Sequence, residues 1–314
     1  MNATAVPSII RTNDLLTGTE WNPVQTREIL HLAADVKARS DRYRGALAGR
    51  VLAMIFEKPS LRTRVSFEVG IASLGGSSVF LDHTVTHLGD RESIPDVAKS
   101  LSRWVNGIVA RVFKQESLGE LAENADVPVI NALSDLYHPC QGLADFFTLE
   151  ERFGNLRGMK IAYVGDGNNV CHSLLSVAAR TGAHIRVAAP RGYGPNPNVV
   201  SEAKRIARDT RGKVEVVDSP EEAVADAQAI YTDVWTSMGQ EEETSSRIAA
   251  FANYQVNEEL FSHAAADALF MHCLPAHRGS EVTAGVIDSP RSIVFEQAEN
   301  RLHVQKAILL TLLN

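Results

Sequence analysis

The sequence has few of the features that mark secreted, membrane-spanning or nucleic-acid-binding proteins. It contains three cysteines, Cys140, Cys171 and Cys273. An odd count without close pairs argues against a disulfide framework and a C-x-x-C metal site, and favours a reducing compartment. No apolar run approaches the ~18 residues that a membrane span requires. Because the first residues lack a basic segment followed by an apolar core, we expect a cytoplasmic protein.

The chain also lacks an excess of basic residues. Its formal net charge is −7, which argues against a nucleic-acid partner because such a partner favours a basic face. A small anionic ligand is still possible, since a local cluster of cations is enough to hold one. Apolar residues make up 45% of the chain and charged residues 22%, as in globular proteins, and a length of 314 residues favours two domains.

Short apolar runs alternate with helical patterns along almost the whole chain. Runs typical of strands are 51–56, 78–81, 107–112, 127–132, 160–164, 184–189, 214–218, 229–234 and 268–272. Helical patterns occupy 93–105, 117–125, 141–153, 169–181, 199–210, 220–227 and about 298–313. This alternation predicts an α/β fold with mostly parallel sheets flanked by helices. Nine strands fit two sheets in two domains better than one sheet.

We place the domain boundary at the helical pattern 141–153, which is followed by a polar turn and a new strand at Lys160. The prediction is a first domain at 1–140, an interdomain helix at 141–153 and a second domain at 154–290. The remaining segment, 291–314, is predicted to end in a helix that packs back on the first domain.

The most informative motif is KPSLRTR at residues 58–64, directly after the first strand pattern. Ser60 stands where a helix N-cap belongs, and the free N–H groups of a helix N-terminus favour an anion. Arg62 and Arg64 add two cations to the same turn. The motif therefore predicts a phosphate or carboxylate site, and the alternative is a capped helix with solvated arginines.

Polar residues follow other predicted strands as well. Ligands of parallel α/β sheets bind beyond the carboxyl ends of the strands, so these residues are candidates for one site. Arg111 lies in an apolar run and fits either a bound phosphate or a structural salt bridge. His138 and Gln141 begin a helix, where an imidazole can donate to a carbonyl oxygen, although a histidine before proline is also common in capping turns. Asp233 offers a carboxylate for an ammonium group.

Two further motifs suggest chemistry that we do not favour. The turn GDGNN at 165–169 lacks the third glycine of a dinucleotide-binding fingerprint. Cys273 follows His272, which suggests a nucleophile or a zinc ligand, but adjacent residues of a strand point to opposite faces, and one cysteine with scattered histidines is a poor zinc set. We therefore predict no metal and no organic cofactor.

The motifs together resemble one family. KPSLRTR at 58–64, HPCQ at 138–141, DVWTSMG at 233–239 and HCLP at 272–275 occur in the order and spacing of the ornithine-type members of the aspartate/ornithine carbamoyltransferase family, with lesser matches at 165–169 and 299–301. The resemblance covers nearly the whole chain. It implies two α/β domains with an active site between them, a homotrimer, and transfer of the carbamoyl group of carbamoyl phosphate to the δ-amine of L-ornithine.

The same resemblance assigns residues to roles. The predicted carbamoyl-phosphate residues are Ser60, Leu61, Arg62, Thr63, His87, Arg111, His138, Gln141, Cys273, Leu274 and Arg301, with His87 reaching the phosphate of a neighbouring subunit. The predicted ornithine residues are Asn169, Asp233, Ser237 and Met238. The predicted catalytic residues among these are Arg62, His138, Asp233 and Cys273, with Cys273 as a binding group and not a covalent nucleophile.

Leu61 departs from the family pattern, which usually has threonine at this position. Leucine keeps the backbone N–H but loses a hydroxyl donor, a loss of roughly 1 kcal/mol in phosphate binding. Leucine here also resembles relatives that carbamoylate N-acylated ornithine. The alternatives to the ornithine prediction are therefore a carbamoyltransferase for an N-acylated ornithine or another amine, and a non-catalytic paralogue that binds metabolites.

Overall fold

The computed structural model describes residues 13–82, 88–236 and 241–314, so the predicted site residues His87, Ser237 and Met238 lie outside the described residues. The chain divides into two compact units, of which unit 1 comprises 1–147 and 300–314 and unit 2 comprises 148–299. The chain enters unit 2 within helix α6 (Pro139–Phe153) and returns to unit 1 within helix α13 (Val294–Leu313). The part that belongs to unit 1 thus begins at Asn300, inside the predicted C-terminal segment.

Unit 1 is built on a four-stranded parallel sheet with the strand order β2-β1-β3-β4. Its strands are β1 (Val51–Phe56), β2 (Ser77–Asp82), β3 (Gly107–Arg111) and β4 (Val129–Leu133). Its helices are α1 (Pro23–Ala38), η1 (Ser40–Tyr43), α2 (Leu61–Ser73), α4 (Ile94–Ser102) and α5 (Gln115–Asn124), with the first part of α6 and the last part of α13.

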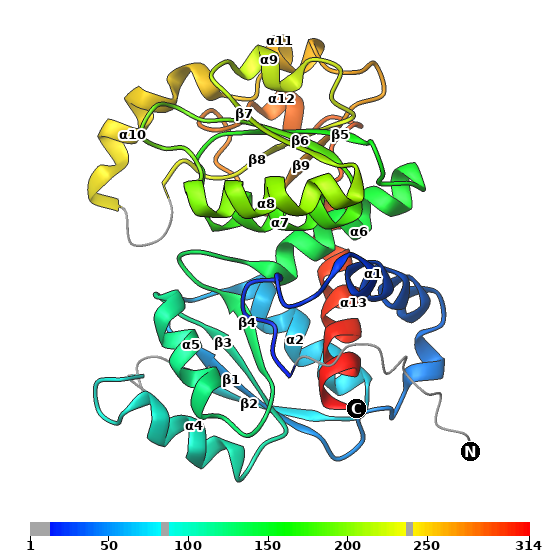
Figure 1. The fold of residues 1–314 in the computed structure, drawn as a ribbon, viewed down its shortest axis with the longest axis vertical. Helices are drawn as coiled ribbons and strands as arrows, with labels where there is room; N and C mark the ends of the chain where they lie inside the picture. The colour runs from blue at the N-terminus through cyan, green and yellow to red at the C-terminus, as the bar shows by residue number, and fades with distance from the viewer. Residues whose placement is uncertain (1–12, 83–87, 237–240) are drawn as a thin grey trace. The chain divides into compact units, whose positions relative to one another are not determined.

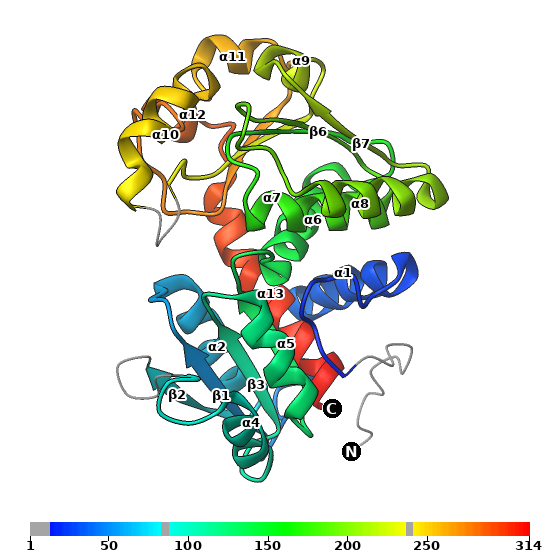
Figure 2. The same ribbon diagram turned by 60° about the vertical axis from the view of Figure 1, so that its left-hand side comes forward.

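Helices cover both faces of this sheet (Figures 1 and 2). Helices α4 and α5 pack on one face, where Ala98 and Leu121 meet apolar residues of β1 and β3 such as Ile55 and Ile108. Helices α2 and α13 contact each other on the other side, where Gly70 leaves room for the side chain of Leu302. Because both faces are covered, β1 and β3 are almost continuously apolar and buried, as expected for a parallel sheet.

Unit 2 is built on a five-stranded parallel sheet with the strand order β7-β6-β5-β8-β9. Its strands are β5 (Lys160–Val164), β6 (His184–Ala188), β7 (Lys213–Val217), β8 (Ala229–Thr232) and β9 (Leu269–His272). Its further elements are α7 (Asn169–Thr181), α8 (Pro197–Thr210), α9 (Pro220–Val224), η2 (Glu241–Glu243), α10 (Thr244–Phe251), η3 (Ala252–Tyr254), α11 (Glu258–Ser262) and α12 (Ala284–Ile287).

Two groups of helices enclose the sheet of unit 2. Helices α7 and α8 lie together on one side in Figure 1, and α9, α11 and α12 pack on the other. The strand order reverses between β5 and β8, which is the topological switch point where open parallel sheets bind ligands. The segments after β5 and β8 carry Asn169 and Asp233, two of the residues predicted to bind ornithine.

The predicted fold class and all nine predicted strands are confirmed, with ends that differ by up to two residues. The prediction omitted α1, although its start has a clear signal. Asn22 accepts hydrogen bonds from the backbone N–H groups of Val24 and Gln25, and the Gln25 side chain accepts from the Asn22 N–H, which is a capping box. No helix within the described residues is long and apolar enough to cross a membrane.

Candidate functional site

The N-terminus of α2 lies at the carboxyl end of β1, as the KPSLRTR motif predicts. Ser60 is the N-cap, and its hydroxyl oxygen accepts a hydrogen bond from the Thr63 N–H at 3.3 Å. Leu61 is the first helical residue and is 76% exposed, and its hydrocarbon side chain offers no polar contact to this turn. The backbone N–H groups that remain at the helix start favour an anion.

The two arginines of the motif have different surroundings. Arg64 is held by its own helix and by strand β2, because its Nε donates to Glu68 at 3.0 Å and its guanidinium lies 3.7 Å from the Phe80 ring centroid. Within the described residues the half-buried Arg62 side chain makes no ion pair or hydrogen bond. Arg62 is therefore the cation of this turn that is available to a ligand.

Thr63 connects α2 to the returning helix α13. Its side chain is buried, and its hydroxyl accepts a hydrogen bond from Arg301 Nη2 at 2.5 Å. Arg301 is 4% exposed, so a full positive charge lies inside unit 1 beside the helix N-terminus. A buried cation next to free helix N–H groups strengthens the case for an anionic ligand.

Arg111 and His138 share this buried electropositive environment. Arg111 ends β3 and is 5% exposed, and His138 lies in the loop between β4 and α6. Burial, and then the charges of Arg301 and Arg111, hold the pKa of His138 well below its ordinary value. The imidazole is therefore neutral at physiological pH and can donate a hydrogen bond to a carbonyl oxygen without carrying a charge.

Gln141 presents an acceptor to the same region. Its Nε2 donates to Asp145 Oδ1 at 2.8 Å. Because a carboxylate oxygen accepts hydrogen bonds, the amide nitrogen must face Asp145 and the amide oxygen must face the other way. The other end, Oε1, is buried and has no hydrogen-bond partner within the described part of the chain. An unsatisfied buried acceptor is costly unless a ligand supplies a donor, and the –NH2 of a carbamoyl group is such a donor.

In unit 2, Asp233 lies at the centre of a polar cluster at the switch point. Its Oδ2 accepts from Asn168 Nδ2 at 2.7 Å, and its Oδ1 accepts from the thiol of Cys273 at 3.0 Å. Asp233 is 5% exposed. Asn168 is the N-cap of α7, and Asn169 is the first helical residue. The sequence prediction named Asn169 and missed Asn168, which is the residue whose side chain donates to Asp233.

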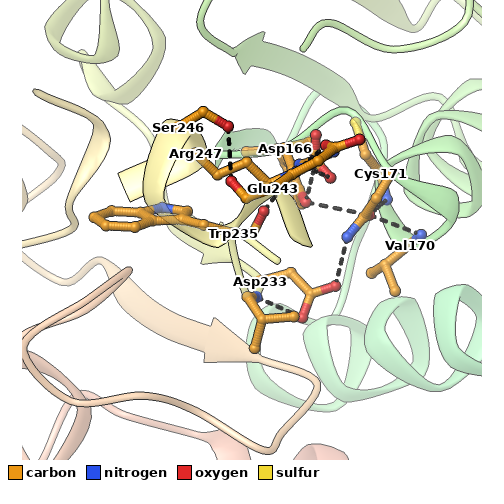
Figure 3. Close-up of polar contacts among 11 residues, drawn as sticks. Asp166, Val170, Cys171, Asp233, Trp235, Glu243, Ser246 and Arg247 are labelled. Carbon is orange, nitrogen blue, oxygen red and sulfur yellow. Dashed lines mark hydrogen bonds and ion pairs between the residues drawn. The ribbon is translucent and has the colours of Figure 1, made fainter. Parts of the chain in front are cut away.

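A buried ion pair holds the loops around Asp233 (Figure 3). Arg247 Nη1 lies 3.1 Å from Asp166 Oδ2 and donates to the carbonyl oxygen of Trp235 at 2.9 Å, while its Nε donates to Glu243. The guanidinium also lies 4.9 Å from the Tyr193 ring centroid. Arg247 thus connects the turn after β5 to the segment after β8, the two segments that supply Asn169 and Asp233.

Asp166 is held in an unusual state by this cluster. Burial raises its pKa to about 6, although Arg247 acts in the opposite direction. In the unfolded chain an aspartate has a pKa of about 3.9. The folded protein therefore holds this proton more tightly, so the carboxyl contributes stability that is fully present below about pH 4 and is lost as the pH rises through about 6.

The prediction is a pH-dependent stability difference between the wild type and Asp166→Asn. Between about pH 4 and 7, the free energy of unfolding of the wild type should fall by up to about 3 kcal/mol relative to the variant, because only the wild type must ionise this buried carboxyl. Urea denaturation of both proteins across this range measures the difference. A difference in the free energy of unfolding that stays constant with pH would contradict the raised pKa of Asp166.

His272 and Cys273 do not act as a pair. The thiol of Cys273 donates to Asp233, whereas His272 Nε2 lies 3.2 Å from Glu281 Oε1 and its Nδ1 accepts from the backbone N–H of Leu274. Asp233, His272 and Cys273 have ligand atoms within 4.8 Å of one another. Both ring nitrogens of His272 are engaged by protein groups, so the donor set of this cluster is poorly suited to a metal ion.

These features describe a protein of two parallel α/β units, with a candidate anion site and a neutral imidazole in one unit and a buried carboxylate at the switch point of the other. Comparison with known proteins identifies the family. Residues 13–151 match the model of the carbamoyl-phosphate-binding domain of aspartate/ornithine carbamoyltransferases, and residues 157–312 match their aspartate/ornithine-binding domain. The chain belongs to the aspartate/ornithine carbamoyltransferase family.

Individual relatives are similar to this chain over nearly its full length. The chain is 50% identical to an ornithine carbamoyltransferase of Anoxybacillus flavithermus, covering 100% of both chains. It is 52% identical to one of Acidothermus cellulolyticus, covering 95% of this chain and 96% of the relative. The structure of ornithine carbamoyltransferase from Pyrococcus furiosus superposes with a TM-score of 0.93 at 49% identity, covering 96% of each chain.

Proposed function

We propose that this protein transfers the carbamoyl group of carbamoyl phosphate to the δ-amine of L-ornithine and yields L-citrulline and phosphate. The observation that carries the proposal is the buried polar cluster of unit 1, in which the neutral imidazole of His138 and the acceptor Gln141 Oε1 occur beside two buried arginines. A carbamoyl group needs a donor for its carbonyl oxygen, an acceptor for its –NH2, and cations for the phosphate that leaves.

We assign carbamoyl phosphate to unit 1 in two parts. The phosphate is held by the helix start from Ser60 to Thr63, with the cations Arg62 and Arg111, and by His87 from a second subunit. The carbamoyl group is held by His138, Gln141 and Arg301, with Cys273 and Leu274 assigned to the same group. Arg301 contributes directly to this arrangement because its hydrogen bond fixes Thr63.

We assign ornithine to Asn169, Asp233, Ser237 and Met238. The buried carboxylate of Asp233 suits an ammonium or amine group. The δ-amine must lose a proton before it can attack, and its free pKa is near that of lysine, about 10.4. Desolvation by a buried site lowers the pKa of an amine, and Asp233 and Cys273 then orient the neutral amine.

The proposed reaction is an addition followed by elimination. The amine nitrogen forms a bond to the carbamoyl carbon, and negative charge develops on the former carbonyl oxygen, where Arg62, Thr63 and His138 stabilise it. The bond between the carbon and the phosphate oxygen then breaks. The phosphate leaves with its charge neutralised by Arg62 and Arg111, and one of its oxygens takes the proton of the amine. The scheme uses no metal and no organic cofactor.

We further propose that the working form is a homotrimer in the cytoplasm. An apolar stripe supports the contact between copies: Leu61, Val65 and Val69 follow one face of α2 and are 76%, 46% and 47% exposed. Val79 on the edge strand β2 is 49% exposed. Exposed apolar stripes beside the outer edge of a sheet are typical of interfaces. Cys140, Cys171 and Cys273 form no disulfide within the described residues, which supports a reducing compartment.

A charge placed in this stripe tests the assembly. Val69→Glu is expected to shift the protein from trimer to monomer, because it would put an unpaired carboxylate into an apolar contact. Light scattering after gel filtration measures the mass, and Val216→Glu on the edge strand of unit 2, where Val216 is 45% exposed, is the matched control. A Val69→Glu protein that remains trimeric would show that this stripe is not the interface.

A panel of acceptor amines tests the substrate. With carbamoyl phosphate in excess, we expect carbamoylation of L-ornithine and little or none of N-acetyl-L-ornithine or putrescine, because Asp233 and Asn169 are assigned to an amino acid. Preference for the acetylated amine would replace the proposal by its closest alternative, for which Leu61 is the motivating residue. Carbamoylation of none of the amines would favour a non-catalytic paralogue.

A further inference from the structure

His272 and Glu281 form a buried pair that the proposed reaction does not use. Both residues are 0% exposed, and His272 is the last residue of β9. His272 Nε2 lies 3.2 Å from Glu281 Oε1, and the same carboxylate oxygen accepts the backbone N–H of His277 at 2.6 Å. Glu281 is anchored in turn, because its carbonyl oxygen accepts the N–H of Val256.

The hydrogen bonds fix which nitrogen of His272 carries the proton. The backbone N–H of Leu274 points at Nδ1 at 2.9 Å, and since a backbone N–H can only donate, Nδ1 must be the unprotonated nitrogen. The proton is therefore on Nε2, where it is donated to Glu281. Burial alone would raise the pKa of Glu281, but the bonds from His272 and His277 outweigh it and hold that pKa below its ordinary value.

Leu274, the residue whose N–H donates to Nδ1, has an uncommon backbone conformation. Leu274 has a φ of 58°, in the left-handed region that residues with a β-carbon rarely adopt. Such conformations persist when neighbouring groups over-determine them, and they cluster at functional sites. Its neighbour Cys273 donates to Asp233, so the conformation at 273–274 directs a thiol toward the buried carboxylate.

We propose that Glu281 and His272 form a positioning pair for the segment 273–274: Glu281 fixes the imidazole tautomer, and the lone pair on Nδ1 holds Leu274 in its left-handed conformation. This inference rests on the proposed function, which assigns Cys273 and Leu274 to the carbamoyl group. The pair touches no substrate. Its effect is on the placement of two residues that do.

Two substitutions separate the two hydrogen bonds of His272, one accepted at Nδ1 from Leu274 and one donated from Nε2 to Glu281. The side-chain oxygen of asparagine can stand at the position of Nδ1, and the side-chain amide of glutamine can stand at the position of Nε2. His272→Asn should keep the acceptor for Leu274 and lose the donor to Glu281. His272→Gln should keep the donor and lose the acceptor.

The expected result is a crossed pattern. His272→Gln should lower kcat/KM for carbamoyl phosphate by about tenfold to a hundredfold, because Leu274 loses the acceptor that positions it. Its melting temperature should stay near that of the wild type, because buried Glu281 keeps its donor. His272→Asn should retain kcat/KM to within about threefold and melt at a lower temperature, because buried Glu281 loses a donor. The inhibition constant of inorganic phosphate, whose assigned residues lie in unit 1, should not change in either variant.

His172→Gln is the matched control, because His172 is also buried and its Nε2 accepts a backbone N–H, that of Asn196. This variant should leave kcat/KM for carbamoyl phosphate unchanged. If the activity of the two His272 variants simply follows their melting temperatures, the role is structural and the inference is wrong. If the wild type carbamoylates no amine, the proposed function itself fails. If the wild type is active but the two His272 variants do not show opposite effects on kcat/KM and on the melting temperature, the proposed function stands and this inference is wrong.

Discussion

Replacing Arg62 by alanine is expected to reduce citrulline formation by at least ~10²- to 10³-fold, the usual effect of removing one group that stabilises transition-state charge. Arg62 lies at the N-terminus of α2, and its side chain makes no ion pair within the described ranges, so it is available to the phosphate and to the developing oxyanion. The same lack of structural partners predicts that the variant folds normally. Steady-state kinetics and a melting curve measure the two effects.

Arg64→Ala is the matched control for Arg62. It removes an arginine two residues further along the same helix, where the guanidinium is already engaged by Glu68 and by the Phe80 ring. We expect kcat/KM for carbamoyl phosphate within about threefold of the wild type, since exposed ion pairs of this kind contribute little. Equal losses in Arg62→Ala and Arg64→Ala would mean that the motif acts through its overall charge and not through Arg62.

Replacing Asp233 by asparagine is expected to reduce kcat/KM for ornithine by about tenfold to a hundredfold, the cost of losing a hydrogen bond to a charged group. Asparagine is nearly isosteric, and its one side-chain oxygen can accept from either Asn168 Nδ2 or the Val234 N–H, which the two carboxylate oxygens accept separately in the wild type. A melting curve of the variant therefore separates the missing charge from a change in the loop. KM for carbamoyl phosphate should change little, because its assigned residues are mainly in unit 1.

Asp226→Asn is the surface control for Asp233, because the Asp226 carboxylate is 83% exposed and lies 3.7 Å from Lys160 Nζ. It should leave both kinetic constants unchanged. If Asp233→Asn raised KM for carbamoyl phosphate and left that for ornithine unaltered, the assignment of Asp233 to the amine would be wrong.

The fold could be predicted from the sequence because its strands are short apolar runs separated by helical patterns. The run from Val51 to Phe56 is buried almost throughout, and such runs are typical of parallel strands covered on both faces. Helix α1 was omitted although Asn22 and Gln25 carry a capping-box pattern and Ile29, Ala33 and Val36 are buried at helical spacing. In this case the signal was present in the sequence.

The candidate site could be predicted only where a motif carries it. Segments such as KPSLRTR place several groups in one turn, so their local geometry follows from the sequence. The pairs Asp166–Arg247 and His272–Glu281 join residues whose partners are set by tertiary packing, and neither has a local pattern. His87, Ser237 and Met238 remain predictions, because they lie outside the described residues.

The structure also changes the interpretation of Leu61. From the sequence, this leucine was a phosphate-binding position with one hydroxyl donor fewer than usual. In the fold its side chain is largely exposed and continues the stripe of Val65 and Val69 along α2. We therefore expect Leu61 to contribute its backbone N–H to the phosphate and its side chain to a contact between copies. Both roles are compatible with an intact anion site.

The most direct test of the account is the stoichiometry of the reaction with purified protein. Incubation with carbamoyl phosphate and L-ornithine, after treatment with a metal chelator, should release L-citrulline and inorganic phosphate in equal amounts, and Arg62→Ala should release neither above background. Phosphate release without citrulline, or citrulline formation that requires an added metal ion, would contradict the proposed transfer.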